Sequence, residues 1–321
     1  MSNKKRILIT RHLPPDVMAR AHETYDVIIS GDDHVMEPRD ILEKSAGAEA
    51  ILCCISEKYD AQLIAGLPDS VRILSTFSVG TDHIDLDTAR KRSLRVGNTP
   101  DAVTISTAEI TMLLILGAAH RGSEGERFLR ERKWQGWQPM LLLGTRISEK
   151  RLGILGLGLI GQAVAERARS FGMEIHYHSR NRVGSETERG AIYHDSLESL
   201  LEVSDVLSLH APSTPQTKHC INASAIEKLP QGAILVNTAR GDLVVDEDVI
   251  AALKSGRLSA AGLDVYEGEP DIHGGYYALE NAVLLPHMGT STIEARNEMG
   301  FAALDNIDAV LAGGEPVFPV V

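Results

Sequence analysis

Residues 151–182 read RLGILGLGLIGQAVAERARSFGMEIHYHSRNR, and this stretch decides the fold. The apolar run 152–155 leads directly into a Gly-x-Gly-x-x-Gly pattern formed by Gly156, Gly158 and Gly161. The first glycine permits a tight turn, the second lets the backbone approach a pyrophosphate, and the third lets a helix pack closely on a strand. An apolar run that ends in these glycines predicts a dinucleotide-binding turn.

The residues after the glycines support this interpretation, because they have the spacing of a helix that stops at Gly172. The apolar residues on its predicted face are Ile160, Val164, Ala168 and Phe171. A second strand is predicted over 174–178. A merely glycine-rich turn would not be followed by helix and strand in this order. Since free N–H groups at a helix start attract phosphate, we expect Leu159, Ile160 and the three glycines to bind the pyrophosphate.

The end of the second strand indicates which dinucleotide binds. About 20 residues into such a unit, NAD-binding proteins carry a carboxylate for the adenine ribose 2′-hydroxyl, but here the sequence is Ser179-Arg180-Asn181-Arg182. A hydroxyl and two guanidinium groups suit a 2′-phosphate, which a carboxylate would repel. We therefore predict that Ser179, Arg180 and Arg182 favour NADP, with NAD still possible. The alternative is that both arginines are ordinary solvated loop charges.

The composition narrows the classes of protein. A chain of 321 residues predicts about two domains, and a formal net charge of −12 argues against a nucleic-acid or anionic-membrane partner. The three cysteines form neither a disulfide framework nor a CxxC pair. His176 and His178 share one face of a predicted strand, but without a third ligand no metal site is expected.

The first residues, MSNKKRILIT, pass from a short basic stretch into a strand-like run without the apolar region of a signal peptide. No stretch of the sequence approaches transmembrane length. We expect a soluble, cytoplasmic protein.

Elsewhere, short apolar runs alternate with amphipathic segments, which is typical of parallel α/β sheets. The runs cover residues 6–10, 26–30, 50–55, 72–77 and 94–98 before the glycine pattern, and 205–210, 233–237, 260–265 and 283–286 after it. Helices are predicted over 14–25, 60–66, 104–119, 246–255 and 291–311. A domain break is expected at Thr99-Pro100, because a residue before proline disfavours helix. The predicted fold class is α/β, with two doubly wound parallel-sheet (Rossmann-like) domains, residues 1–99 plus 289–321 and residues 100–288.

Further motifs carry a family resemblance. They are VGTDHID (79–85), NTP (98–100), NTARG (237–241), AGLDV (261–265), EGEP (267–270) and LPHMG (285–289). Together with the glycine pattern, they make the chain resemble the D-isomer-specific 2-hydroxyacid dehydrogenases over nearly its whole length. The strand end at 179–182 and the segment 134–144 most resemble the glyoxylate/hydroxypyruvate reductases of that family.

The resemblance implies a substrate domain and a dinucleotide-binding domain, with the active site in the cleft between them. It implies a homodimer that reduces a small 2-oxo acid, glyoxylate or hydroxypyruvate, to the D-2-hydroxy acid. Such a substrate needs a cation for its carboxylate and an acid for its carbonyl oxygen. By the resemblance, Arg240 binds the substrate, His287 is the general acid that also contacts the substrate, and Glu269 orients the imidazole. Without these motifs, each residue would have a more ordinary interpretation. Arg240 would be part of a surface ion pair, Glu269 a solvated loop carboxylate and His287 a histidine at a strand end without a function.

Other site residues rest on the resemblance alone. The backbone of Val79 and Gly80 is expected to receive the substrate carboxylate, although an ordinary glycine turn would look the same. The expected cofactor contacts beyond the glycine pattern come from Pro212, Thr238, Asp264 and Gly289. A buried capping role is the alternative for Asp264. Trp134 and Trp137 lie in the segment that resembles a dimerisation arm.

Two other functions share this fold. A D-3-phosphoglycerate-type dehydrogenase remains possible, although such enzymes usually keep the acidic NAD residue. A non-enzymatic, dinucleotide-sensing corepressor would bind NAD(H) with that same acidic residue. A formate dehydrogenase would pair the histidine with glutamine, so Glu269 argues against it.

Overall fold

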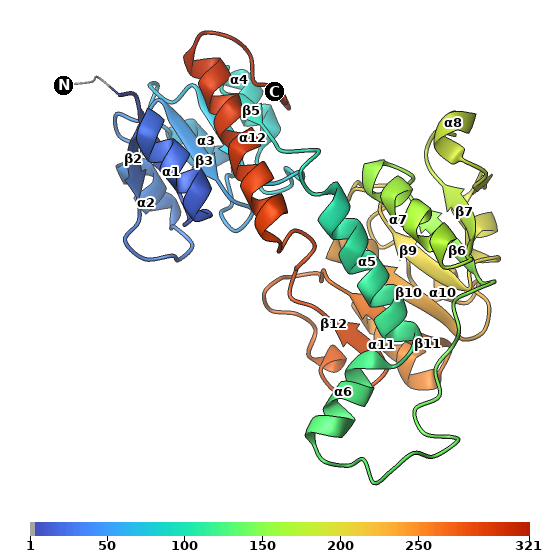
Figure 1. The fold of residues 1–321 in the computed structure, drawn as a ribbon. Helices are drawn as coiled ribbons and strands as arrows, with labels where there is room; N and C mark the ends of the chain where they lie inside the picture. Colours follow the sequence, from blue (N-terminus) through green and yellow to red (C-terminus); the bar gives the residue numbers. More distant parts are fainter. Residues whose placement is uncertain (1–3) are drawn as a thin grey trace. The chain divides into compact units, whose positions relative to one another are not determined.

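The computed structural model describes residues 4–321 and divides into two units, each with its own parallel sheet (Figure 1). The first unit contains the chain up to Val103 together with Ser291–Val321, and the second contains Thr104–Thr290. The division lies a few residues after Thr99-Pro100, because the first helix of the second unit begins at Thr104. The predicted α/β fold class with two parallel sheets is confirmed.

The first unit is built on a sheet with the strand order β2-β1-β3-β4-β5. Its strands are β1 (Arg6–Ile9), β2 (Asp26–Ile29), β3 (Ala50–Cys53), β4 (Ile73–Thr76) and β5 (Arg95–Gly97). The register places Leu8 of β1 between Ile28 and Ile51. Strands β3 and β4 are buried throughout, which explains why they appear in the sequence as unbroken apolar runs.

Helices cover both faces of this sheet. They are α1 (Pro15–Thr24), α2 (Pro38–Lys44), α3 (Ala61–Gly66), α4 (Leu86–Lys91) and α12 (Ile293–Leu311). Helices α1 and α12 lie side by side, with α12 against β3 and β4 (Figure 1). On the other face, α2, α3 and α4 contribute Ile41, Leu63 and Ala89 to one core with strand residues such as Ile51.

The C-terminal helix α12 is fastened to the first unit by side-chain hydrogen bonds. Ser75 Oγ donates to Ala303 O at 2.9 Å, and Asn306 Nδ2 donates to Asn98 O at 2.9 Å. A Cβ at Gly97 would lie 2.8 Å from Asn306 Cγ, so the buried amide reaches the strand only because residue 97 has no side chain.

The second unit has a sheet with the order β12-β11-β10-β9-β6-β7-β8. Its strands are β6 (Arg151–Leu155), β7 (Glu174–His178), β8 (Ile192–Tyr193), β9 (Val206–Leu209), β10 (Ala233–Asn237), β11 (Leu258–Leu263) and β12 (Ala282–Leu284). From β6 the chain proceeds to β7 and β8 on one side, then returns to β9 on the other. In open parallel sheets, ligands bind at the carboxyl ends of the strands at this switch point.

The helices of the second unit again lie on both faces. They are α5 (Thr104–Ala119), α6 (Gly122–Arg130), α7 (Leu159–Ser170), α8 (Ser185–Glu188), α9 (Leu197–Leu201), α10 (Ala223–Ile226) and α11 (Asp246–Ser255), with 3-10 turns at Gly241–Leu243 and Gly274–Tyr276. Helices α5 and α7 share one core, and α9, α10 and α11 share the other. No helix within residues 4–321 has the length and apolarity that a membrane crossing requires.

Candidate active site

The glycine turn after β6 has the shape that the sequence predicts. Gly156 has φ of +98°, and its N–H donates to His178 O at 2.8 Å. A Cβ at Gly156 would lie 2.8 Å from the His210 carbonyl carbon, and one at Gly161 would lie 2.3 Å from Gly156 O. Backbone therefore approaches backbone at both positions, which only glycine allows.

The start of α7 fits an anionic ligand. Gly158 is the N-cap residue and has no side chain to accept from the first-turn N–H groups. A Cβ at Gly158 would meet nothing within 4 Å, so the space in front of the helix is open. Leu159 is exposed, while Ile160 packs against the core. Open space before the uncapped N–H groups of a 12-residue helix suits a pyrophosphate.

Two alanine variants are expected to separate packing from ligand binding in this turn. Gly161→Ala forces a methyl group onto the backbone of Gly156 and should lower the free energy of unfolding by about 1–3 kcal/mol, together with dinucleotide affinity. The methyl group of Gly158→Ala has room in the free protein, so this variant should lose little stability. It should still weaken dinucleotide binding, because the methyl group occupies the space where the pyrophosphate approaches the backbone. Thermal unfolding and calorimetric NADPH titration measure both. Equal stability of the two variants would contradict this account of the turn.

The end of β7 differs in part from the prediction. Ser179 Oγ accepts a hydrogen bond from Leu157 N–H at 2.8 Å, which places this hydroxyl beside the glycine turn. Arg180 is exposed and has no ion-pair partner within residues 4–321. Arg182, also predicted to bind the cofactor, differs from Arg180 because its guanidinium is paired with Glu188 at 2.6 and 3.1 Å.

The ion pair between Arg182 and Glu188 has a physical reason that the sequence patterns do not indicate. Glu188, the last residue of helix α8, is buried, and a buried carboxylate needs charged or hydrogen-bonding partners. Hydrogen bonds from Arg182 and Tyr177 lower the pKa of Glu188 to about 2. Glu188 is a residue that the sequence analysis missed, since it lies six positions beyond Arg182 in a four-residue helix without a recognisable pattern.

His287 and Glu269 are in direct contact. His287 follows β12 with φ of +54°, and its Nδ1 lies 2.7 Å from Glu269 Oε2. The second oxygen, Oε1, accepts from Tyr266 N–H at 2.7 Å. Both side chains of the pair are about one-third exposed, so the imidazole is held yet accessible.

Electrostatics keeps Glu269 ionised. Burial alone would raise its pKa, but the hydrogen bonds from His287 and Tyr266 and the charge of Arg240 hold the pKa below the ordinary value. An ionised carboxylate only accepts hydrogen bonds, so Nδ1 of His287 carries a proton and Nε2 faces away from Glu269. Nε2 is therefore the ring nitrogen of His287 that remains for a bound molecule.

Arg240 stands at the end of β10, in a turn shaped by Asn237. Asn237 Oδ1 accepts from Ala239 N–H at 3.0 Å, and its Nδ2 donates to Arg240 O at 2.8 Å. The half-buried Arg240 donates from Nη1 to Ala239 O at 2.6 Å. Asn237 belongs to the NTARG motif but was not predicted to have a role; an asparagine that closes a strand-end turn is the signal that identifies it.

Asp264 has the capping geometry that was the alternative interpretation. It is 1% exposed, and its two oxygens accept from Met288 N–H at 2.6 Å and Gly289 N–H at 2.7 Å. Burial raises the pKa of Asp264 despite these hydrogen bonds. Because His287 N–H also donates to Asp264 O at 2.9 Å, Asp264 fixes the turn that carries His287.

The remaining predicted residues also follow parallel strands. In the second unit, Pro212 follows β9 and is exposed, while Thr238 follows β10 and shares a hydrogen bond with Thr111 at 2.9 Å. In the first unit, Val79 and Gly80 follow β4. The Val79 carbonyl accepts from Asn98 Nδ2 at 2.8 Å, and the Gly80 carbonyl from Ser78 Oγ at 2.7 Å.

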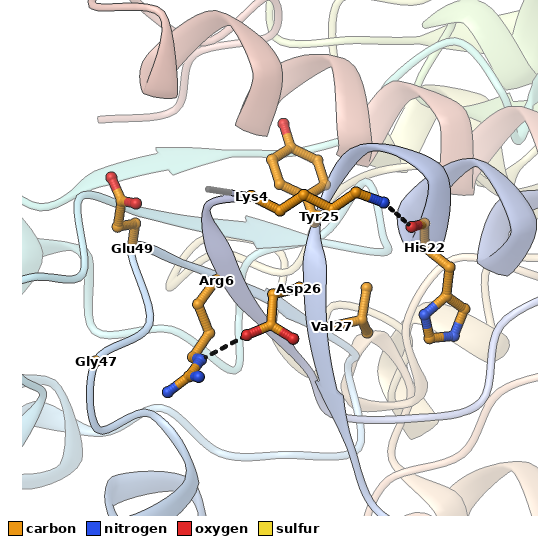
Figure 2. A pocket seen from close by; sticks show the side chains of 8 residues that line it. All are labelled: Lys4, Arg6, His22, Tyr25, Asp26, Val27, Gly47 and Glu49. Carbon is orange, nitrogen blue, oxygen red and sulfur yellow. Dashed lines mark hydrogen bonds and ion pairs between the residues drawn. The ribbon is translucent and has the colours of Figure 1, made fainter. Parts of the chain in front are cut away.

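Figure 2 shows a surface hollow at the opposite, amino edge of the first sheet. Its cations already have internal partners: Lys4 donates to His22 O at 2.8 Å, and Arg6 pairs with Asp26 at 2.9 Å. Parallel sheets bind ligands at their carboxyl edges, so this hollow is not the candidate site. Within the described chain, no three His, Cys, Asp or Glu side chains gather as a metal site would need.

The fold and site together define a class of protein, an oxidoreductase that uses a nicotinamide dinucleotide. A family model described as "D-isomer specific 2-hydroxyacid dehydrogenase, NAD binding domain" matches residues 112–289. Over 315 residues the chain is 49% identical to the glycerate dehydrogenase of Hyphomicrobium methylovorum, with 98% of each chain covered. It therefore belongs to the D-isomer-specific 2-hydroxyacid dehydrogenase family of NAD(P)-dependent oxidoreductases, and the resemblance seen in the sequence is confirmed.

Two further similarities are relevant to the substrate and cofactor. The chain is 38% identical over 318 residues to the glyoxylate reductase of Thermococcus litoralis, covering 98% of this chain and 96% of that one. The solved structure of an NADPH-dependent glyoxylate/hydroxypyruvate reductase from Sinorhizobium meliloti, in complex with NADP and malonate, matches with a TM-score of 0.89 and 29% identity. That match covers 99% of this chain and 97% of the other.

Proposed function

We propose that the protein reduces a small 2-oxo acid, glyoxylate or hydroxypyruvate, to the 2-hydroxy acid, which for hydroxypyruvate is the D isomer, with NADPH as the preferred cofactor. The observation that carries this proposal is the 2.7 Å contact between His287 and Glu269, in the same unit as the glycine turn. The similarity to a glycerate dehydrogenase and a glyoxylate reductase supports the substrate class.

The proposed chemistry assigns each residue a task. The bound dinucleotide supplies a hydride to carbon 2 of the substrate. His287 donates the Nε2 proton to the carbonyl oxygen, so one hydride and one proton convert the carbonyl group to an alcohol. Glu269 orients the imidazole through the contact with Nδ1, and Arg240 binds the carboxylate through its guanidinium fork. In the oxidative direction His287 accepts the proton.

We propose that the second unit binds the dinucleotide. The sequence motifs place this domain at residues 100–288. The pyrophosphate of the dinucleotide is bound by the N–H groups of the glycine turn, and the other contacts to the dinucleotide come from Pro212, Thr238, Asp264 and Gly289. The first unit provides substrate contacts through the backbone of Val79 and Gly80.

The preference for NADPH is proposed from the end of β7. Ser179 is fixed beside the glycine turn and Arg180 is exposed, so a hydroxyl and a cation are available where NAD-binding proteins place a carboxylate. The NADP complex of the Sinorhizobium meliloti relative supports this assignment. NAD remains a possible second cofactor, since Ser179 also suits a ribose hydroxyl.

We also propose a homodimer. Residues 134–143 expose several large apolar side chains, namely Trp134, Trp137, Met140 and Leu143, with Trp137 82% exposed. An exposed group of large apolar residues marks an interaction surface. Light scattering of the purified protein would give a mass of twice 34.8 kDa if this is correct, and a monomer mass would contradict it.

A pH profile of Glu269→Gln tests the proposed function. The amide keeps the size of the side chain but removes the charge that favours protonated His287. The alkaline limb of reductive kcat/KM should therefore move to lower pH in this variant, with activity retained at acidic pH. Glu267→Gln is the matched control, because this exposed neighbour pairs with His219 instead. An unmoved limb in Glu269→Gln would refute the catalytic pair.

A further inference from the structure

A closed set of contacts joins the end of β7 to α8. Arg182 Nε and Nη2 donate to the two oxygens of Glu188 at 2.6 and 3.1 Å. Tyr177 OH donates to Glu188 Oε1 at 2.7 Å and accepts from Val183 N–H at 3.3 Å. The Arg182 guanidinium also lies over the Tyr193 ring, 5.6 Å from its centroid. The turn that bears Ser179 and Arg180 is therefore fastened at its far end.

Burial determines which partner controls this cluster. The Glu188 side chain is 10% exposed, whereas that of Arg182 is 63% exposed. Tyr177 is fully buried. A buried carboxylate that loses its partner pays a large desolvation penalty, so Glu188 holds Arg182 in place against solvent.

We infer that Glu188 and Arg182 form a positioning pair that fixes the turn at residues 179–183 and so sets the discrimination between a 2′-phosphate and a 2′-hydroxyl. The inference rests on the proposed function, in which the adenine ribose binds at this strand end. Arg182 acts through Ser179 and Arg180 and does not itself bind the phosphate. The Nε and Nη2 side of the Arg182 guanidinium, which could otherwise bind a phosphate through two parallel hydrogen bonds, is already occupied by Glu188.

The two roles of Arg182 predict opposite results for Glu188. If Arg182 is a positioning residue, removing either partner loosens the same turn, so both variants weaken phosphate recognition and the double variant is no worse than one single variant. If Arg182 binds the phosphate directly, Arg182→Met weakens recognition while Glu188→Gln releases the arginine and strengthens it.

The experiment is calorimetric titration of the full chain with 2′,5′-ADP and 5′-AMP, which differ only by the 2′-phosphate. The wild-type protein should bind 2′,5′-ADP at least tenfold tighter. Glu188→Gln, Arg182→Met and the double variant should each reduce this ratio about five- to tenfold, with 5′-AMP affinity changed less than twofold. A purely structural defect would instead weaken both ligands together.

Two further variants test whether the change in net charge, and not the lost contact to Glu188, causes the effect. Glu186→Gln changes the net charge equally on the same helix, but Glu186 is exposed, so the ratio should stay within twofold of wild type. Tyr177→Phe removes a hydrogen bond to Glu188 without changing charge and should lower the ratio in the same direction. Tighter 2′,5′-ADP binding by Glu188→Gln than by Glu186→Gln would overturn the inference.

Failure of the inference and failure of the proposed cofactor preference have different signatures. A wild-type protein that discriminates strongly, with unchanged discrimination in Glu188→Gln and Tyr177→Phe, contradicts the positioning pair alone. A wild-type protein that binds both nucleotides equally contradicts the NADPH preference, and the positioning pair with it.

Discussion

Replacing His287 with asparagine is expected to lower kcat for 2-oxo acid reduction about a thousandfold, within the range for loss of a general acid. The variant has no titratable imidazole, and Glu269 is left without its partner. Asparagine is chosen because His287 has φ of +54°, a left-handed conformation that asparagine tolerates better than alanine. The backbone turn held by Asp264 should therefore survive.

The measurement for His287→Asn is single-turnover reduction of hydroxypyruvate at saturating NADPH, combined with an NADPH titration. NADPH affinity should stay within about threefold, because the glycine turn is untouched. His219→Asn is the matched control, since His219 also has positive φ and pairs with a glutamate, Glu267. A His287→Asn enzyme with near-normal kcat would remove His287 from the chemistry.

Replacing Arg240 with lysine is expected to lower kcat/KM for 2-oxo acids about a hundredfold. Lysine keeps the positive charge but loses the planar fork, so one of two charge-assisted hydrogen bonds to the carboxylate is lost and the remaining one is poorly oriented. Most of the effect should appear in KM, while NADPH binding measured by calorimetry stays near wild type. Arg146→Lys, at an exposed surface pair with Glu149, should be neutral. Wild-type kinetics in Arg240→Lys would make Arg240 a structural residue.

Local signals made much of the fold predictable. The helix Thr104–Ala119 and the helix Asp246–Ser255 have the predicted bounds, the latter because Gly256 ends it in a left-handed conformation. The strand predicted over 50–55 ends at Cys53, since apolar residues continue beyond the last ladder pair. Helix α8 and strand β8 were missed, because segments of four and two residues carry no periodicity.

The sequence motifs predict which residues form the candidate site, and the fold is needed to establish their contacts. His287 and Glu269 stand 18 positions apart, so only the fold establishes the hydrogen bond between them. The capping of the His287 turn by Asp264 likewise depends on β11 and β12 being neighbours in the sheet. The two arginines at the end of β7 look equivalent in sequence, yet burial of Glu188 makes one of them a structural partner.

The most direct test of the central claim is the ratio of kcat/KM with NADPH to that with NADH, measured for glyoxylate and hydroxypyruvate, with chiral analysis of the glycerate formed from hydroxypyruvate. We expect turnover of at least one of these acids, D-glycerate as the product from hydroxypyruvate, and a ratio of at least about ten, equivalent to roughly 1.4 kcal/mol. Arg180→Ala should bring the ratio close to one. Equal or better use of NADH by the wild-type enzyme, or formation of the L-product, would contradict the account.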